Sequence, residues 1–325
     1  MKKRKNLRTL IILIISIVIA YCINNNQIIY TKSYNEVKID NLKDEQFEYE
    51  KCLISKFDEN EVSDNLSNKQ EELNQYLSKY NVSIVYEDIS TGFNYKYQSD
   101  KVYYGASLIK LVEAEYLIDK AINNEIDLDN TFVKYYEKYK ADDSIGMSSR
   151  KISEDISLKD LISYILKYSD NTAHYMLIDY IGMSNLKKYG NNLGAINILT
   201  GGDTYGNQSA IDTNIYLKHA YEIMNSNTSY GTFLKECMTN TYYNYLNLNG
   251  DDNNVAHKWG WHSYYFHDIG IVFEEYPYTI SILTSHGKGD YQSIVNNIHK
   301  KINELHHLFY AERENYCKEN ISKKN

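Results

Sequence analysis

Apolar residues recur at two different spacings along this 325-residue chain, and the changes between them mark its elements. Between residues 66 and 80 they lie three or four positions apart, which predicts an amphipathic helix. The runs 82–87 and 93–97 are instead rich in β-branched and aromatic residues, and a short polar segment ending at Gly92 separates them. This second pattern predicts a β-hairpin.

The helical spacing returns and dominates from about residue 107 to about residue 225. Ser157, followed three positions later by Asp160, resembles a capping box in front of an apolar run. Gly182 follows the next apolar run and is typical of a helix end. The middle of the chain is therefore predicted to form an all-helical subdomain.

Three more strand-like runs follow at 255–262, 266–273 and 278–285, and a last helical pattern covers 290–311. The simplest assembly is one antiparallel sheet of about five strands, flanked by the N- and C-terminal helices, with the helical subdomain beside it. The predicted fold class is therefore α/β in the broad sense, and α+β in the narrower one.

These elements place a single domain at residues 65–315. Its sheet subdomain would comprise residues 65–106 and 226–315, its helical subdomain residues 107–225, and residues 316–325 would form a tail. Residues 24–64 are predicted to be an acidic tether, because acids outnumber lysines there and no apolar period persists.

The first 23 residues set the expected compartment. A basic cluster in residues 1–8 precedes an uncharged run at 9–23 that is rich in Ile and Leu. This order is typical of an uncleaved signal anchor or of a cleaved signal peptide. An acylated Cys22 is the third alternative, although the bulky Tyr21 precedes it. We expect an extracytoplasmic protein, anchored in the membrane through residues 9–23, or secreted if that segment is removed.

Composition narrows the classes of function. The net charge is −8 although the first eight residues are basic, so nucleic acid is not an expected partner, because phosphate binding needs basic surface. The cysteines fit neither a disulfide framework nor a zinc pattern, although Cys52, Cys237 and Cys317 could form one pair. His257 and His262 would point to opposite faces of a strand, so no metal is expected, and no other cofactor. A monomer is expected.

The segment Ser107-Leu108-Ile109-Lys110 begins the helical subdomain and could carry nucleophilic chemistry. Positions i and i+3 share a helix face, so Lys110 would lie about one turn from the Ser107 hydroxyl. A serine hydroxyl needs a base to remove its proton, and a lysine with a lowered pKa can serve. The positive end of the helix dipole would also face an oxyanion at Ser107. By itself, the pattern equally fits a capping serine beside a surface lysine.

Two further elements follow in order. Ser169-Asp170-Asn171 lies in a break between two predicted helices, where these residue types also act as caps. Lys258-Trp259-Gly260 lies on the first of the last three strands, where a glycine often marks a close backbone approach and a lysine could hold a carboxylate. The alternative for this second element is a solvent-facing lysine beside an incidental glycine.

The order Ser-x-x-Lys, Ser-Asp-Asn, Lys-x-Gly resembles the motif set of the penicillin-recognising serine hydrolases, in particular the class A β-lactamase-like family. The resemblance covers about residues 66–312. It implies that Ser107 forms an acyl-enzyme and that Lys110 is the general base or helps to position it. It also implies that Ser169 relays a proton to the leaving nitrogen, supported by Lys258, which attracts a substrate carboxylate.

The same resemblance implies the remaining site residues. Asn171, Trp259 and Gly260 would contact the substrate, and the backbone N–H groups of Ser107 and Trp261 would form the oxyanion hole. The substrate would be a β-lactam or a peptide of peptidoglycan.

The chain departs from this family in two places. Trp259 replaces the usual Thr or Ser of Lys-Thr-Gly, and with it the hydroxyl that binds the substrate carboxylate is lost. The Glu-x-x-Leu-Asn motif, whose glutamate activates the deacylating water, is missing between Asn171 and Lys258. The nearest imitation contains Asp203, a weak candidate for this base, in a segment that also fits an ordinary turn.

Three functions remain open. The first is an exported, membrane-tethered serine hydrolase that cleaves the amide of β-lactams through an acyl-enzyme at Ser107. The second is a D,D-peptidase or penicillin-binding-type enzyme of the cell wall. The third is a weakly catalytic binder or sensor of β-lactams or wall fragments. The missing glutamate motif predicts slow deacylation, which argues against an efficient β-lactamase.

Overall fold

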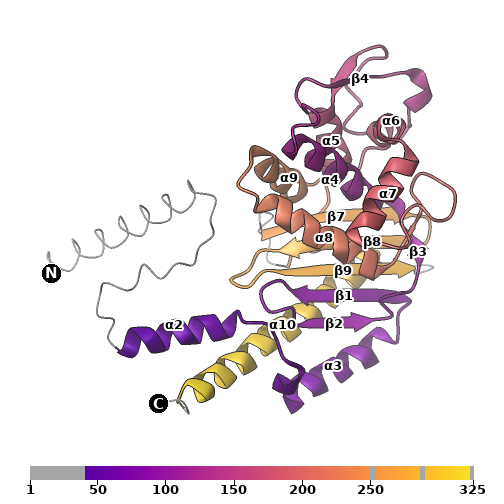
Figure 1. The fold of residues 1–325 in the computed structure, drawn as a ribbon. Coiled ribbons are helices and arrows are strands. Elements are labelled where there is room, and N and C mark those ends of the chain that lie inside the picture. The colour runs from indigo at the N-terminus through magenta and orange to yellow at the C-terminus, as the bar shows by residue number, and fades with distance from the viewer. Residues whose placement is uncertain (1–40, 249–253, 286–289, 323–325) are drawn as a thin grey trace, which may run out of the picture. The chain divides into compact units, whose positions relative to one another are not determined.

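The computed structural model describes residues 41–248, 254–285 and 290–322 (Figure 1). The chain divides into two compact units, residues 1–50 and residues 51–325, and the second contains the sheet and the motif residues. No helix among the described residues has the length and apolar character needed to cross a membrane. The predicted anchor at residues 9–23 and the first part of the predicted tether lie outside the described residues.

A five-stranded antiparallel sheet forms the centre of the second unit, with strand order β2-β1-β9-β8-β7. Its strands are β1 (Val82–Asp88), β2 (Asn94–Tyr97), β7 (Val255–His262), β8 (Tyr265–Val272) and β9 (Tyr278–Ser285). This sheet confirms the predicted antiparallel sheet of about five strands. Both faces are buried: Ile84 and its cross-strand partner Ile282 face one apolar cluster, while Val85 and Leu283 face the other.

Helices cover both faces of the sheet (Figure 1). One face carries α3 (Asp64–Leu77) and α10 (Tyr291–Ser322). The other carries α8 (Ala210–Met224) and α9 (Ser229–Thr239). Four more helices pack beyond these two; they are α4 (Ile109–Ile122), α5 (Leu158–Lys167), α6 (Asn171–Ile181) and α7 (Met183–Leu193).

Short elements complete the fold. Two ribbons pair β3 (Tyr103–Tyr104) with β6 (Asn207–Gln208), and β4 (Phe132–Lys134) with β5 (Asp155–Ser157). Single 3-10 turns form η1 (Glu59–Glu61), η2 (Ala106–Leu108) and η3 (Glu137–Tyr139). The ribbon β3–β6 has the larger consequence, because it joins the segment before Ser107 to the segment after Asp203.

Local capping explains two helix boundaries that the sequence predicts. The Ser157 hydroxyl accepts a hydrogen bond from the Asp160 N–H (3.1 Å) and starts α5, and Gly182, at φ +81°, ends α6. A reciprocal capping box forms instead at Ser209 and Asp212, in front of α8.

The structure adds detail at three of the predicted boundaries. Helix α9 lies inside the range 226–315 assigned to the sheet subdomain, where it packs against β7 and also against α5 and α8. Helix α10 continues to Ser322, so the predicted tail at 316–325 is helical over most of its length. The last part of the predicted tether, residues 51–64, folds within the second unit.

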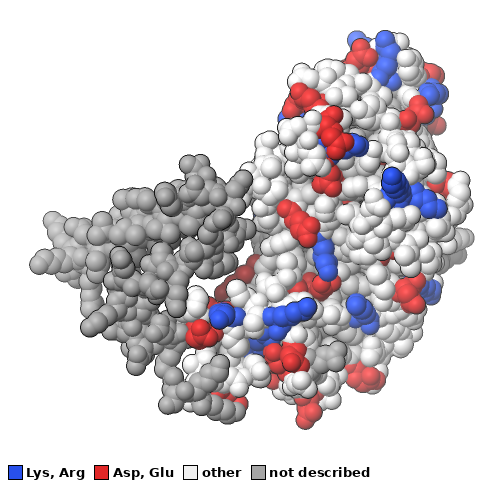
Figure 2. All heavy atoms as spheres, viewed as in Figure 1, with Lys and Arg blue, Asp and Glu red and all other residues white. Residues whose placement is uncertain are grey.

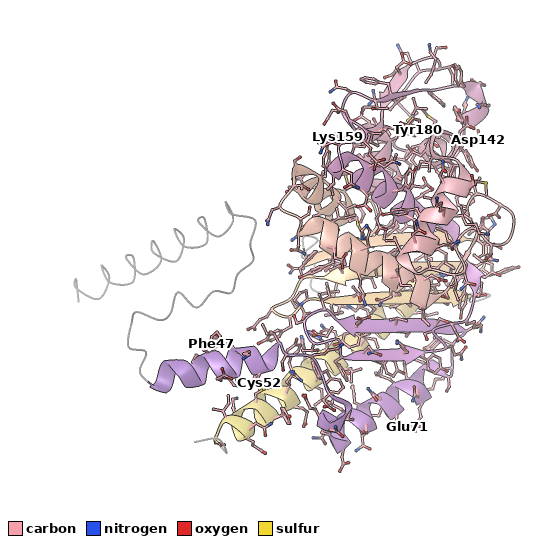
Figure 3. All side chains as sticks on the ribbon, in the orientation of Figure 1. Phe47, Cys52, Glu71, Asp142, Lys159 and Tyr180 are labelled. Carbon is pink, nitrogen blue, oxygen red and sulfur yellow. A yellow bond between two sulfur atoms is a disulfide. The ribbon has the colours of Figure 1, made fainter. Side chains whose placement is uncertain are left out.

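A disulfide explains why residues 51–64 are ordered. Cys52 pairs with Cys317 of α10, with 5.8 Å between their Cα atoms (Figure 3). The buried Arg313, one turn before Cys317, donates to the carbonyls of Leu53 and Cys52 (both 2.9 Å) and pairs with Glu61. The remaining Cys237 is a buried thiol in α9. One covalent bond and one buried guanidinium thus hold this segment on the C-terminal helix.

Charged residues of both signs are interspersed over the face of the molecule shown in Figure 2. Several form exposed pairs, for example Lys159 with Asp129 (2.8 Å). Exposed pairs of this kind contribute little to stability, in the range of about 0–1 kcal/mol. The fold therefore rests on the two apolar clusters and on the disulfide.

Candidate active site

The chain reaches Ser107 through a tightly packed turn. The Gly105 N–H donates to the Gly206 carbonyl (2.8 Å), and Ala106 adopts a left-handed conformation at φ +46°. A non-glycine residue at positive φ is strained, and such strain is concentrated at functional sites. Ser107 itself lies in η2, which leads directly into α4, and its side chain is only 8% exposed. Ser107 is not a helix cap, because the N-cap residue of α4 is Leu108, which makes no side-chain capping bond.

Lys110 lies one turn further along, completely buried. Its Nζ is 3.0 Å from the Ser107 Oγ, and it donates to the Ser169 carbonyl and to the Asn171 Oδ1, both at 2.6 Å. A surface lysine, the simpler alternative for this motif, is therefore excluded. The base and the nucleophile are in direct contact.

Ser169 and Lys258 extend this contact into a chain of polar groups. Ser169 lies between α5 and α6 at φ +55°. Its Oγ accepts a hydrogen bond from the Lys258 Nζ (2.9 Å) and lies 3.4 Å from the Lys110 Nζ. The structure thus brings together Ser107, Lys110, Ser169 and Lys258, which come from three distant parts of the sequence.

Burial controls the charge of both lysines. It lowers the pKa of Lys110 from 10.5 to about 8, although the negative charges of Glu113 and Asp170 oppose the shift. Burial also lowers the pKa of Lys258 well below its ordinary value, and the positive charge of Lys110 lowers it further. A lysine with a pKa of about 8 has an appreciable neutral fraction near neutral pH, which a base requires.

Asn171 begins α6 and bridges the site to its rim. Its Oδ1 accepts from Lys110 and from the Tyr205 hydroxyl (3.0 Å), and its Nδ2 donates to Asp143 Oδ2 (2.8 Å). These partners fix the orientation of the amide. Asp143 and Tyr205 carry no motif that the sequence analysis could use.

Gly260 lets the edge strand β7 pass against the nucleophile. A Cβ at this position would lie 3.1 Å from the Ser107 N and 3.3 Å from the Gly105 carbonyl oxygen. The predicted close approach is therefore a backbone-to-backbone contact. An edge strand also leaves backbone N–H groups unpaired on its outer side, where a ligand can accept from them. The neighbouring Trp261 side chain is 61% exposed.

Trp259 lies beside Lys258, with its ring centroid 5.0 Å from the Lys258 Nζ. Its indole packs edge-on against Tyr243 (5.3 Å between centroids) and Tyr245 (6.4 Å). The indole Nε1 is buried and has no hydrogen-bond partner among the described residues. The indole therefore fills the space between Lys258 and these two tyrosines without donating a hydrogen bond among the described residues.

The histidines of the last strands have structural partners. His257 Nδ1 bonds Asp268 Oδ1 (2.8 Å), and both side chains are fully buried. Asp268 therefore lies inside β8 and pairs across to β7. His267 donates to the Tyr104 carbonyl (2.8 Å) and accepts from the Thr284 N–H (3.1 Å), which braces the segment before Ser107. Within the described ranges, no cluster of three or more His, Cys, Asp or Glu could hold a metal.

Comparisons with known proteins agree with this arrangement. The profile of the Beta-lactamase enzyme family matches residues 68–305. The chain belongs to this family. Known structures share the fold: a mutant of PBP-A in an acyl-enzyme complex with penicillin G has a TM-score of 0.66 at 16% identity, covering 74% of this chain and 97% of that one.

Two β-lactamases are similar to the same degree. The TLA-3 extended-spectrum β-lactamase has a TM-score of 0.65 at 20% identity, over 73% of this chain and 97% of that one. A β-lactamase from Chitinophaga pinensis DSM 2588 has a TM-score of 0.63 at 17% identity, over 74% and 98%. At these identities the structural matches establish the fold alone.

Asp203 does not replace the glutamate of the Glu-x-x-Leu-Asn motif, which this chain lacks. Asp203 is exposed, and its Oδ1 accepts from the backbone N–H groups of Tyr205 (3.0 Å) and Gly206 (2.7 Å) in a local turn. In the part of the chain that the structure describes, no hydrogen bond joins Asp203 to Ser107 or Lys110. The ordinary turn, the alternative interpretation of this segment, is what the structure contains.

Tyr205, two residues after Asp203, is the side chain of this segment that reaches Lys110 and Asn171. Its ring centroid is 5.8 Å from the Lys110 Nζ, and its hydroxyl lies 3.0 Å from the Asn171 Oδ1 and 3.3 Å from the Tyr175 hydroxyl. Burial raises the pKa of Tyr205, so the phenol is neutral. Sequence reasoning missed this residue because a tyrosine has no place in the family motif.

The sequence analysis also did not predict the buried pair of Glu113 and His174 near Lys110. Glu113, one turn after Lys110, bonds His174 Nδ1 (2.6 Å), and His174 Nε2 lies 3.1 Å from the Thr204 hydroxyl. Both side chains of the pair are fully buried. The only signal in the sequence is a glutamate three positions after Lys110 within an apolar helix.

We expect acylation of Ser107 to follow the pKa of Lys110 and Glu113→Gln to shift that dependence. The wild-type rate should rise with pH through about 8. Glu113 raises the pKa of Lys110, so its neutralisation should move the midpoint to lower pH, by about 0.5 to 1 unit. The matched control is Glu115→Gln on the same buried helix, because burial raises the pKa of the Glu115 carboxyl and so disfavours a negative charge there. A midpoint that moves equally in both variants, or in neither, contradicts the assignment.

Proposed function

We propose that the protein is an acyl-transfer enzyme that attacks amide bonds with Ser107, including the amide of β-lactams, and that hydrolyses its acyl-enzyme slowly. The single observation that carries this proposal is the buried chain from Ser107 Oγ through Lys110 Nζ to Ser169 Oγ and Lys258 Nζ. A nucleophile in contact with a base whose pKa is lowered is the arrangement that covalent catalysis requires.

Acylation would proceed as follows. Neutral Lys110 takes the Ser107 proton as Oγ bonds to the carbonyl carbon, and the carbonyl π electrons move to its oxygen. When the C–N bond breaks, the proton passes through Ser169 to the leaving nitrogen, and Lys258 stabilises the Ser169 oxygen meanwhile. Lys110 and Ser169 are within 3.4 Å of each other, which suits this transfer.

The oxyanion would be bound by the backbone N–H groups of Ser107 and Trp261. The close approach of β7 at Gly260 supports this pairing, since it places the strand directly against Ser107. Loss of one such donor typically costs about 3 kcal/mol in the activation free energy. Asn171 would bind the amide side chain of the substrate.

Slow deacylation follows from the groups around Lys110. Hydrolysis of the ester needs a base that activates water, and Tyr205 lies where the segment after α7 meets Lys110 and Asn171. A neutral phenol is a poor base at pH 7. The similar PBP-A mutant was solved as an acyl-enzyme with penicillin G, which supports a covalent complex of this kind.

A D,D-peptidase or penicillin-binding-type reaction on peptidoglycan peptides is the second candidate, and Tyr205 is the observation that favours it over efficient β-lactam hydrolysis. In this reaction an amine or water of the cell wall would accept the acyl group. The basic cluster followed by the apolar run at 9–23 supports export and anchoring outside the cytoplasm. A weakly catalytic sensor would retain the covalent label but transfer it to no acceptor.

Labelling with a fluorescent penicillin tests the proposal. We expect wild-type protein to carry a covalent label that survives denaturing electrophoresis and persists for minutes to hours after dilution. Ser107→Ala should abolish the label, while Ser90→Ala, an exposed serine in the β1–β2 turn, should leave it unchanged. Rapid turnover of penicillin without accumulated label would instead identify an efficient β-lactamase. A label retained in Ser107→Ala would refute Ser107 as the nucleophile.

A further inference from the structure

We propose that the cleft beside Ser107 selects substrates whose acyl side chain carries an ammonium group, and that Asp203 recognises this cation. The inference rests on the proposed acylation of Ser107 and adds its substrate class. It assigns Asp203 a role in specificity that differs from the base of the family motif.

The cleft adjoins the nucleophile along strand β7. It has a volume of about 540 Å³, within the range of small-molecule sites, and lies between the β7–β8 turn, strand β3 and the segment after Asp203. Residues two apart in a strand share a face, so His262 follows Gly260 on the side that meets Ser107. The distance between these positions is about 7 Å. A group attached to the acyl carbonyl can therefore extend from Ser107 into the cleft.

Aromatic rings form one wall of the cleft, with Tyr104 at their centre. Its ring centroid lies 5.1 Å from that of His262, 5.9 Å from that of Tyr265 and 6.3 Å from that of Tyr205. The faces of such rings attract alkylammonium groups, and several rings around one site strengthen the attraction. Burial and the negative charge of Asp203 raise the pKa of Tyr104 to about 12, so its hydroxyl stays a neutral donor.

Asp203 is the one carboxylate among the described residues that line the cleft, and His262 is the one imidazole. None of the described residues that line the cleft is Lys or Arg. The backbone N–H groups of Tyr205 and Gly206 hold one carboxylate oxygen in place, and no ion pair to Asp203 occurs among the described residues. The Tyr104 hydroxyl also hydrogen-bonds to Asp203, but no Lys or Arg neutralises this carboxylate among the lining residues. A fixed carboxylate of this kind beside aromatic faces favours a cation and disfavours an anion.

Three penicillins that differ only at the α-carbon of the acyl side chain test this inference. They are benzylpenicillin, its α-amino analogue and its α-carboxy analogue, and the second-order rate of Ser107 acylation is measured for each by competition with fluorescent penicillin. At about pH 6.5 the α-amino group is protonated. We expect the amino compound to react roughly three- to tenfold faster than the neutral one, and the carboxy compound to react more slowly.

The variant Asp203→Asn should remove this preference, so that the amino compound and benzylpenicillin react at about the same rate. The matched control is Glu71→Gln, which removes one negative charge from α3 on the other face of the sheet (Figure 3). This variant should keep the preference for the amino compound. Added salt should reduce the wild-type preference.

The outcomes separate the two proposals. If none of the three penicillins labels Ser107, the proposed function itself fails. If all label it but show no preference for the amino compound, or if Asp203→Asn keeps the preference, the inference about the cleft is overturned. If Asp203→Asn slows loss of the label rather than acylation, Asp203 is a deacylation base and the inference is again wrong.

Discussion

Replacement of Lys110 by alanine is expected to slow acylation of Ser107 by a β-lactam roughly 10³-fold. Among the described residues, Lys110 is the only one whose side chain hydrogen-bonds to the Ser107 Oγ, at 3.0 Å. Without it the hydroxyl keeps its proton, and a serine alcohol is a weak nucleophile at neutral pH. The measurement is the second-order rate of labelling by a fluorescent penicillin at pH 8.

A second variant separates the base from a merely structural lysine. Lys110→Arg keeps the positive charge, but a guanidinium does not lose its proton in a protein, so this variant should be as slow as Lys110→Ala. The control is Lys120→Ala. Lys120 lies in the last turn of the same helix and pairs with Glu125, so this variant should label normally. Normal labelling of Lys110→Arg would show that Lys110 is not the base.

Loss of the Cys52–Cys317 disulfide should have the largest effect on stability. The bond closes a loop of 265 residues, and a loop of this length restricts the unfolded chain strongly. We expect Cys52→Ser/Cys317→Ser to reduce the free energy of unfolding by about 4 kcal/mol. The measurement is urea denaturation of the oxidised wild type and of the double variant, followed by fluorescence.

Reduction provides the control for this prediction. A reductant should bring the wild type to the stability of the double variant and leave the variant itself unchanged. Penicillin labelling in the absence of urea should be equal in all samples, because α10 packs on the sheet face away from α8 and α9. Equal denaturation midpoints for the oxidised wild type and the double variant would contradict the prediction.

Local patterns in the sequence predicted most of the fold. A strand alternates its faces and a helix repeats every 3.6 residues, so the runs 82–87 and 255–262 could be assigned without knowledge of their neighbours. The same holds for caps such as Ser157, which need only residues of their own turn. The predicted end of the last helix was too early. Helix α10 continues to Ser322, and in this part of it Arg313 and Cys317 contact residues 52–61, which local patterns cannot reveal.

The candidate site divides in the same way. The four residues Ser107, Lys110, Ser169 and Lys258 could be found because their spacing and order resemble a known motif set. Tyr205 and the pair Glu113–His174 could not, since their importance comes from contacts with Lys110, Asn171 and Thr204 across separate elements. The pairing of Asp268 with His257 could not be predicted either, because the two residues are neighbours only across two paired strands.

The amino-acid sequence by itself determined which groups can react: a hydroxyl, two amines and a strand glycine, in a fixed order, and no glutamate motif to complete hydrolysis. The tertiary structure alone decided how reactive they are. Burial removes water from Lys110 and Lys258, and this desolvation lowers both pKa values, which the positive charge of Lys110 reinforces at Lys258. It also decided which side chains surround the substrate, because helices, strands and turns that are remote in sequence meet only when both faces of the sheet are covered.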